Sequence, residues 1–254
     1  MLQLAKKEIL MAQSHSTPTF RPLYEQIKIL VTQSLVAGEW RPGEVIPSEL
    51  ELASRFKVSQ GTVRKAIDEL AAENILMRRQ GKGTFVATHT EEHNQYRFLR
   101  IVELNGKQDV PISKLINCER IKADNIAADR LGLKRGTPVV VVRRLIKFSG
   151  ESVILDNIYL SATLFKGLNE AVIQEFQGTL YSLYEVRYGT RIIHAEERIQ
   201  AIAADETTAG LLGIPPGTPL LDIDRVAYTY GGQPVEWRVS RCDTKHHCYL
   251  NELG

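Results

Sequence analysis

A short run of small and polar residues that ends in two basic side chains is the first part of this sequence that could act on a polyanion. An arginine guanidinium can grip the O6 and N7 atoms of guanine or a phosphate group, and a glutamine amide can pair with adenine. Small side chains beside them let the backbone approach a duplex closely. We therefore expect DNA contacts from this run, whose members are Ser59, Gln60, Gly61, Thr62, Arg64 and Lys65.

A second group with suitable chemistry is the segment Gln80-Gly81-Lys82-Gly83, which lies between two short apolar segments. Paired glycines supply the positive φ angles that a tight β-hairpin needs. Lys82 stands between the two glycines, so the tip of the hairpin is narrow and cationic. Such a tip suits the minor groove or the phosphates of DNA.

The charge distribution permits a nucleic-acid partner but does not require one. The whole chain has 32 basic and 30 acidic side chains, a net charge of +2, whereas residues 55–87 alone have seven basic and three acidic ones. A modest basic region of this kind is compatible with DNA binding. Any single charged residue could equally lie on a solvated helix face. The ordered combination of residues therefore carries the DNA interpretation.

The residues around these two groups predict elements that can present them. Apolar side chains recur at three- and four-residue spacing in three segments, which is typical of helices with one buried face. Ser48 and Glu51 have the spacing of a capping box at the start of the second helix. Three helices followed by a hairpin is the order of a winged helix-turn-helix. The expected bounds are 22–37, 48–56 and 59–73 for the helices, and 75–79 and 84–87 for the strands.

The second half of the chain contains an internal repeat. The segment LGLKRGTPV at 131–139 matches LGIPPGTPL at 212–220, an offset of 81 residues. Each copy follows a short helical stretch that ends at a glycine, and each continues into a strand that contains an arginine, Arg144 or Arg225. Two helix–turn–hairpin units predict a pseudo-symmetric α+β domain built on an antiparallel sheet.

The two repeated arginines are candidate ligand-binding residues. Strand alternation places Arg144 on the same face as Val142 and Ile146, and Arg225 has a similar apolar setting. A buried guanidinium needs a carboxylate or phosphate partner, because an unpaired buried charge is costly. The partner is either an internal carboxylate, with Asp156 or Glu236 as candidates, or an anionic group of a ligand. Both alternatives stay open at this point.

Residues 18–87 resemble the DNA-binding domain of the gluconate-repressor (GntR) family. The matching motifs are PLYEQI at 22–27, GEWRPG at 38–43, PSE at 47–49, S-x-x-TVRKA at 59–66 and GKGTFV at 81–86. This resemblance implies a homodimer on a palindromic DNA operator, with Ser59, Thr62 and Arg64 contacting the DNA and the tip at 81–83 in the minor groove. Ser48 and Gln80 are further expected DNA contacts. Leu50 and Gln60 stand where the family often has arginine, which implies a shifted operator preference.

Residues 98–250 resemble the effector domain of the HutC-type subfamily, called UTRA, which shares the chorismate-lyase fold. The resemblance implies a small-molecule effector, with Arg144 as the first of two effector-binding arginines. The second falls on Ile146, with Lys147 adjacent, and a usual tyrosine falls on Cys242. We therefore expect a carboxylate or phosphate effector unlike the amino-sugar phosphates in detail. The expected effector-binding residues are Phe98, Arg144, Lys147, Asp156, Arg225 and Glu236.

These observations define an expected organisation. We expect an N-terminal extension at 1–17, a winged helix at 18–87, a linker at 88–97 and an effector domain at 98–250. Three cysteines cannot all pair, no apolar run is long enough to span a membrane, and no secretion signal is present, which favours the cytoplasm. No cofactor motif, convincing metal site or catalytic triad is found. The competing hypothesis is a lyase-like enzyme with a vestigial DNA-binding head.

Overall fold

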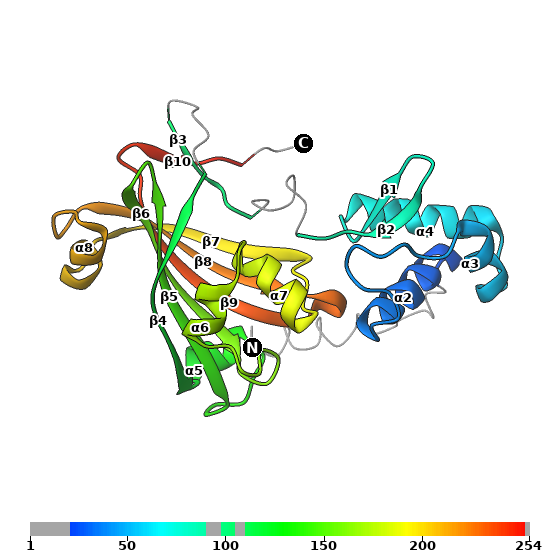
Figure 1. Cartoon of the computed structure of the whole chain (residues 1–254), viewed down its shortest axis with the longest axis horizontal. Coiled ribbons are helices and arrows are strands. Elements are labelled where there is room, and N and C mark those ends of the chain that lie inside the picture. Colours follow the sequence, from blue (N-terminus) through cyan, green and yellow to red (C-terminus); the bar gives the residue numbers. More distant parts are fainter. Residues whose placement is uncertain (1–20, 90–97, 105–109, 252–254) are drawn as a thin grey trace, which may run out of the picture.

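The computed structural model describes residues 21–89, 98–104 and 110–251, and it has two lobes (Figure 1). The smaller lobe is built from the first helices and a hairpin, and the larger lobe is built on one twisted sheet. The predicted N-terminal extension at 1–17 lies outside the described residues. Most of the predicted linker, from 90 to 97, lies outside them as well.

The smaller lobe has the predicted winged-helix order. Helix α2 (Leu23–Val36), α3 (Glu49–Phe56) and α4 (Gln60–Ala72) precede the antiparallel strands β1 (Leu76–Arg79) and β2 (Gly83–Val86). Apolar residues at helical spacing face inward, as the sequence predicts. The core of this lobe includes Ile27, Val31, Leu35, Leu52, Val63, Ile67 and Leu70.

Two hydroxyl side chains define the starts of α3 and α4. Ser48 caps α3 in a complete capping box with Glu51, so the predicted box is confirmed. Ser59 caps α4, where its Oγ accepts a hydrogen bond from the backbone N–H of Thr62 at 3.2 Å. Lys57 ends α3 in the left-handed conformation, with φ at 55°. The turn between the two helices is therefore short, which places their starts close together.

The larger lobe is a six-stranded antiparallel sheet in the order β4-β5-β6-β9-β8-β7. Strands β4, β5 and β6 form one half of the sheet, and β7, β8 and β9 form the other half in the reverse order, so that β6 and β9 pair at the centre. This arrangement confirms the predicted pseudo-symmetric α+β sheet. The strands are β4 (Ile112–Lys122), β5 (Pro138–Phe148), β6 (Glu151–Ser161), β7 (His194–Ala203), β8 (Pro219–Tyr228) and β9 (Pro234–Asp243).

Equivalent residues start and stop the repeated helices α5 (Asn125–Arg130) and α8 (Glu206–Leu212). Asp124 caps α5 and Asp205 caps α8, each through its carboxylate and a backbone N–H three residues on. Gly132 and Gly213 end the helices with positive φ angles of 61° and 75°, a conformation that glycine adopts without steric cost. The offset of 81 residues thus extends to the caps.

Helices cover both faces of the sheet (Figure 1). Helices α5 and α8 pack on one face, and α6 (Glu170–Glu175) and α7 (Leu180–Tyr188) pack on the other. A separate pair of strands, β3 (Ile101–Glu103) and β10 (His247–Tyr249), joins the C-terminal segment to the segment that follows the linker. The face under α6 and α7 carries the cavity described below.

The two lobes touch through buried residues. Tyr230 in the short turn η1 (Tyr230–Gly232) and Ile193 pack against the core of the winged helix. Thr88 and His89, which fall in the predicted linker, are buried at 6% and 1% exposure against α7. The chain therefore enters the larger lobe through an ordered contact at 88–89.

Candidate functional sites

The start of α4 is an exposed surface of short polar side chains. Ser59, Gln60 and Gly61 are exposed, and Thr62 is half-buried. The hydroxyls of Ser59 and Thr62 lie 2.8 Å apart in a hydrogen bond. No heavy atom lies within 3.4 Å of where a Gly61 Cβ would stand, so packing does not require this glycine. Its absent side chain instead leaves the backbone open to a partner.

Arg64 is held by a carboxylate that the sequence analysis did not identify. The Glu49 Oε2 atom accepts from Arg64 Nε at 2.9 Å and from Gln60 Nε2 at 3.3 Å, and Glu49 Oε1 accepts from Arg78 at 2.9 Å. Burial opposes ionisation, but the hydrogen bond and charge of Arg64 outweigh it, so the pKa of Glu49 is lowered. Glu49 thus joins the starts of α3 and α4 to strand β1.

The hairpin tip has the predicted form. Gly81 and Gly83 have φ angles of 70° and 107°, and the Lys82 N–H donates to the Arg79 carbonyl at 2.9 Å to close the turn. Gln80, Gly81, Lys82 and Gly83 are all exposed. The tip projects beyond the helices in Figure 1. A narrow cationic loop is therefore available to a partner.

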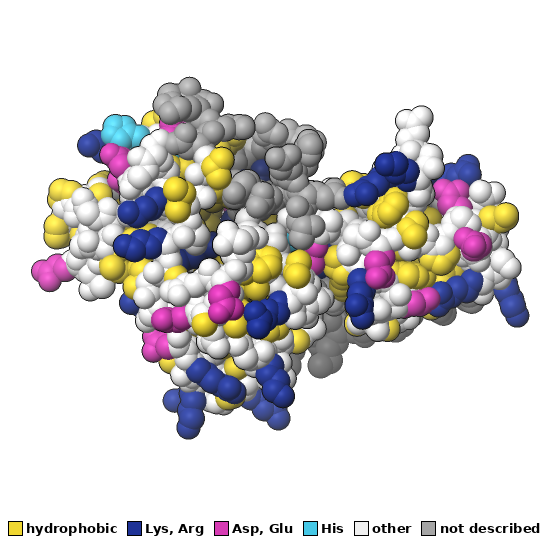
Figure 2. Space-filling view, in the orientation of Figure 1, with side chains coloured by type: hydrophobic (Ala, Val, Ile, Leu, Met, Phe, Trp, Pro, Cys, Tyr) yellow, Lys and Arg dark blue, Asp and Glu magenta, His cyan; other side chains and the backbone are white. Residues whose placement is uncertain are grey.

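Two other predicted contact residues have local partners. Ser48 donates from its hydroxyl to Glu51 Oε2 at 2.7 Å, so its side chain serves the cap of α3. The Lys65 Nζ atom lies 3.8 Å from the ring centroid of Tyr24, which turns this ammonium toward α2. Figure 2 shows Lys and Arg side chains interleaved with Asp and Glu on the visible face, in keeping with the modest net charge.

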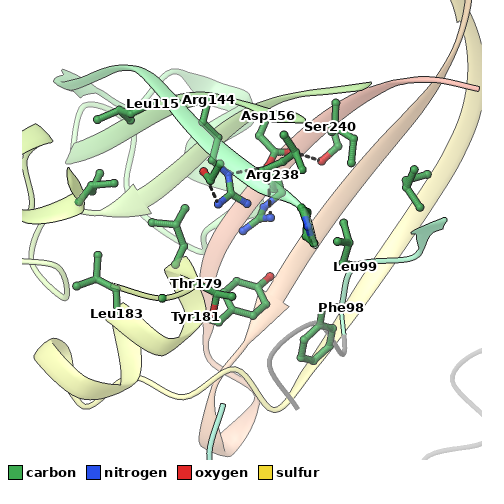
Figure 3. A pocket seen from close by; sticks show the side chains of 18 of the residues that line it. Phe98, Leu99, Leu115, Arg144, Asp156, Thr179, Tyr181, Leu183, Arg238 and Ser240 are labelled. Carbon is green, nitrogen blue, oxygen red and sulfur yellow. Dashed lines mark hydrogen bonds and ion pairs between the residues drawn. The ribbon is translucent and has the colours of Figure 1, made fainter. Parts of the chain in front are cut away.

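A cavity of about 550 Å³ opens between the sheet and the segment that contains α6 and α7. Its floor is formed by side chains on one face of β4, β5, β6, β8 and β9, and one wall is formed by residues 98–101. Figure 3 shows Arg144 and Arg238 turned toward one another beside Asp156, with Tyr181 of α7 and Phe98 at the walls. Its size is within the usual range for a small-molecule site.

Strand registers explain why charged groups meet on this floor. One row across the sheet aligns Leu115, Arg144, Asp156, Ser240 and Ile223. The next row aligns Ile158, Arg238, Arg225 and Glu197. Residues that are far apart in the sequence thus become neighbours on one face.

Asp156 is the ionised centre of the first row. Its carboxylate accepts from Arg144 Nε at 2.9 Å and from the Ser240 hydroxyl at 2.6 Å, and Arg238 lies 3.5 Å away. Burial raises the pKa of this acid, but Arg144 and Arg238 outweigh burial and lower it. The internal carboxylate partner that the sequence left open for Arg144 is therefore present.

Arg225 has a different partner from those predicted. Its Nε atom donates to Glu197 Oε1 at 2.6 Å, and its terminal nitrogen donates to the Phe98 carbonyl at 2.6 Å. Neither Asp156 nor Glu236 takes this role. Glu197 lies beside Arg225 because β7 and β8 pair in register, which repeat analysis alone does not reveal.

Glu236 and Lys147 do not line the cavity, which corrects two of the predicted effector contacts. Glu236 is fully buried behind Arg238, which donates two hydrogen bonds to it at 3.0 and 2.9 Å. Tyr181 and Tyr184 each donate to the same carboxylate at 2.9 Å. Lys147 is not among the lining residues because adjacent strand residues point to opposite faces, and Ile146 faces the cavity.

Arg238 is the cavity residue that the sequence analysis missed. It aligns with Arg225 across β8 and β9, and its side chain is 9% exposed. A signal existed, since Arg238 is two residues beyond Glu236 and therefore on the same face of its strand. Burial and the charge of Glu236 raise the pKa of Tyr181 to about 12, so this hydroxyl remains a donor near neutral pH.

Helix α7 connects the cavity to the winged helix. Thr179, Leu180 and Tyr181 line the cavity. One turn further on, Ser182 donates to the His89 carbonyl at 3.0 Å, and Glu185 accepts from the His89 N–H at 3.0 Å. The cavity wall and the 88–89 segment are thus held by one helix.

Arg191 completes this connection. Its side chain is 1% exposed, and its Nε atom lies 3.6 Å from Glu185 Oε2. Its terminal nitrogens donate to the carbonyls of Asn74 and Ile75, at 2.7 and 3.4 Å, at the junction of α4 and β1. A single buried guanidinium therefore ties the larger lobe to the element that follows the candidate DNA-contacting helix.

Comparison with known families agrees with both sites. Residues 23–86 match the model for bacterial regulatory proteins of the gntR family, and residues 106–247 match the UTRA domain. The chain belongs to the GntR family. It is a DNA-binding transcription regulator whose UTRA domain binds a small-molecule effector.

Relatives of this GntR regulator cover most of its length. The HTH-type transcriptional regulator Rv0792c of Mycobacterium tuberculosis is 32% identical, over 87% of this chain and 80% of that protein. The HTH-type transcriptional repressor NagR of Bacillus subtilis is 29% identical, over 85% of this chain and 88% of that protein. Because the matched relatives are named as regulators, the lyase-like enzyme hypothesis is wrong.

A solved structure supports the same assignment for the UTRA domain. The ligand-binding domain of a GntR-family regulator from Bordetella bronchiseptica superposes with a TM-score of 0.62 and 35% identity. It covers 63% of this chain and 99% of that domain. In the described part of this chain, no helix is long and apolar enough to cross a membrane, and no group of His, Cys, Asp or Glu is arranged as a metal site.

Proposed function

We propose that this GntR regulator is a homodimeric repressor that binds a palindromic operator and releases it when a small anion enters the UTRA cavity. Similarity to the repressor NagR favours repression. The proposed winged-helix domain spans residues 18–87, and the proposed UTRA domain spans residues 98–250. A protein that acts on chromosomal DNA in this way works in the cytoplasm.

The proposed DNA contacts come from two places. The start of α4 enters the major groove, where Arg64 and Gln60 face base edges and Ser59 and Thr62 contact phosphates. The Glu49 carboxylate engages Arg64 through Nε, and neither terminal nitrogen of Arg64 has a hydrogen-bond partner among the described residues, so both can reach a guanine or phosphate. The hairpin tip with Lys82 enters the minor groove.

The arginine-rich floor of the cavity is the observation that best supports an anionic effector. Arg144, Arg225 and Arg238 converge from three strands on one face. Arg144 donates from Nε to Asp156, and one of its terminal nitrogens makes a long 3.4 Å contact to Ser113. Its other terminal N–H groups can therefore donate to a ligand. The start of α7 also lines the cavity, and helix starts favour anions.

The coupling between effector and operator runs through α7. A ligand that presses on Tyr181 or Thr179 shifts the helix that holds residues 88–89 and, through Glu185, Arg191. The winged helices of a dimer would then lose the spacing of their half-sites. Coupling free energies of this kind are typically about 1–3 kcal/mol.

A titration of the full-length protein on a labelled fragment of its own promoter tests this function. Carboxylates and phosphorylated sugars are added in turn, and the expected result is a roughly 5–150-fold weaker operator affinity with one of them. Arg144→Met should keep its operator affinity but no longer lose it when the anion is added. Arg143→Met, on the opposite face of β5, should keep both its operator affinity and its response to the anion. An Arg144→Met protein that still responds fully would contradict the proposed site.

A further inference from the structure

In the part of the chain that the structure describes, the cavity has one more arginine than it has paired carboxylates. Arg144 pairs with Asp156, Arg225 with Glu197, and Arg238 with Glu236. Arg100 lines the same cavity from the segment before β3. Within residues 21–89, 98–104 and 110–251, no carboxylate forms an ion pair with it. Among the described residues, four arginines against three carboxylates leave a single unit of positive charge for a ligand to neutralise.

A single surplus charge discriminates between kinds of anion. A carboxylate carries one negative charge at neutral pH, and a phosphate monoester carries about 1.5 to 2. A dianion in this half-closed site would leave an uncompensated negative charge beside Asp156, which is costly in a desolvated setting. Charge complementarity therefore favours a monoanion.

The part of the cavity beside the charged floor is aliphatic. Ile146 and Ile154 face each other two residues along their strands from the Arg144–Asp156 pair. Ile223 lies opposite Ser240 on the neighbouring strand. Ile101 of β3 packs in the same cluster as these three isoleucines. These four isoleucines belong to one packed cluster that reaches the cavity lining. Their side chains offer no hydrogen bonds. A ligand hydroxyl placed against these isoleucines would therefore be unsatisfied, although Gln174, Gln177 and Thr179 line another part of the cavity.

We propose that the effector is a monocarboxylate with an apolar body, and not a sugar phosphate. Its carboxylate lies over Arg144 and Arg238 within reach of Arg100, and its body lies over the isoleucines of β5, β6 and β8. This inference rests on the proposed function, because it refines the anion that the UTRA cavity receives. The cavity of about 550 Å³ accommodates a small ring or a short chain.

The test compares matched probes on the full-length protein by thermal shift and calorimetric titration. The probes are 3-phenylpropanoate, its neutral amide 3-phenylpropanamide, hexanoate, phenyl phosphate and glucose 6-phosphate. We expect the two carboxylates to raise the melting temperature, because a ligand that prefers the folded state stabilises it. The amide should bind about tenfold to a hundredfold more weakly, since it lacks the charge-assisted hydrogen bonds.

Variants assign the effect to the cavity. Arg100→Met should reduce the preference for 3-phenylpropanoate over its amide, and Arg144→Met should abolish it. Arg143→Met, whose side chain bonds Asn157 on the other face, should leave it unchanged. Ile154→Val, a smaller change in the same packed cluster, should weaken the binding of 3-phenylpropanoate and of hexanoate.

Each outcome separates this inference from the proposed function. Stabilisation by phenyl phosphate or glucose 6-phosphate but by neither carboxylate would overturn the monocarboxylate class and leave the anionic effector standing. Equal binding of the amide and the carboxylate would overturn both the monocarboxylate class and the anionic effector. If no probe changes the melting temperature while a metabolite anion still releases the operator, the inference fails alone.

Discussion

At the scale of single residues, the proposed DNA-contacting surface depends on how a few hydrogen-bond donors are held. Gln60, Arg64 and Arg78 all donate to Glu49, although they come from two different elements. Ser59 and Thr62 bond to each other and leave the helix start compact. This surface is therefore pre-organised before any duplex arrives, which limits the ordering cost of binding.

Arg64→Ala should weaken operator binding by about 1–3 kcal/mol if Arg64 reads a base edge. Fluorescence anisotropy with the promoter fragment and with a matched unrelated duplex gives the change. Arg55→Ala is the control, because Arg55 is an exposed residue in the last turn of α3 that pairs with Glu39 and lies over Trp40. Equal operator affinity of the Arg64→Ala and wild-type proteins would reject the base-reading role.

Lys82→Ala should flatten the salt dependence of binding. Each phosphate contact contributes roughly 0.9 to the slope of log affinity against log salt, because counterions are released from the duplex. The exposed ammonium at the hairpin tip should account for about one such contact. An unchanged slope for the Lys82→Ala protein over the same salt series would show that the tip does not touch phosphate.

The pKa of Asp156 links stability to acid pH. Because its pKa is lower in the folded protein than in the unfolded chain, its ionised form stabilises the fold above the unfolded value of about 3.9. That contribution is lost as pH falls through the lower folded value. The free energy of unfolding should therefore fall progressively as the pH drops below about 5, measured by urea denaturation at each pH.

Asp156→Asn isolates this contribution. The variant should show a shallower decline toward acid pH and be less stable near neutral pH by about 3–5 kcal/mol, because Arg144 and Arg238 lose a buried charged partner. A variant with the same acid slope as wild type would show that other carboxylates carry the dependence.

At the scale of elements, sequence patterns predicted what local rules decide. Helical spacing, the Ser48 capping box, the glycines of the hairpin and the 81-residue repeat each predicted an element or an architecture that the structure confirms. Strand alternation also placed Arg144 on the inward face. These features depend on residues that are close together in the sequence, so they can be predicted from it.

Partners across elements could not be predicted in the same way. Glu49, Glu197 and Arg238 acquire their roles only when helix starts meet or strands pair in register. Lys147 was placed in the site by family resemblance, and its strand parity argues against it. Sequence reasoning therefore placed Phe98, Arg144, Asp156 and Arg225 at the cavity, but it did not identify Arg238 or the Glu197 partner of Arg225.

Helix α7 is the element through which we propose that the effector acts on the winged helix. Arg191→Met should remove the contacts between this lobe and the carbonyls of Asn74 and Ile75. We expect calorimetry to resolve two unfolding transitions in the variant where the wild-type protein shows one, since the lobes would no longer unfold together. Arg187→Met, at an exposed position of α7, is the matched control. A single unchanged transition in Arg191→Met would argue against the coupling.

At the scale of the whole molecule, a winged helix and a ligand-binding sheet are joined by a buried, hydrogen-bonded contact. The UTRA cavity and the 88–89 segment share α7, so neither lobe can move without changing the other's contacts. Family membership establishes a regulator with a DNA-binding head and an effector domain. The arrangement explains how one chain can couple the two.

The most direct measurement compares the full-length protein's affinity for its own promoter fragment with that for an unrelated duplex of equal length, at about 0.15 M ionic strength. Specific binding of this kind exceeds non-specific binding by roughly a thousandfold or more, so the account predicts at least that ratio. Equal affinity for the two duplexes, with and without 3-phenylpropanoate, would contradict it.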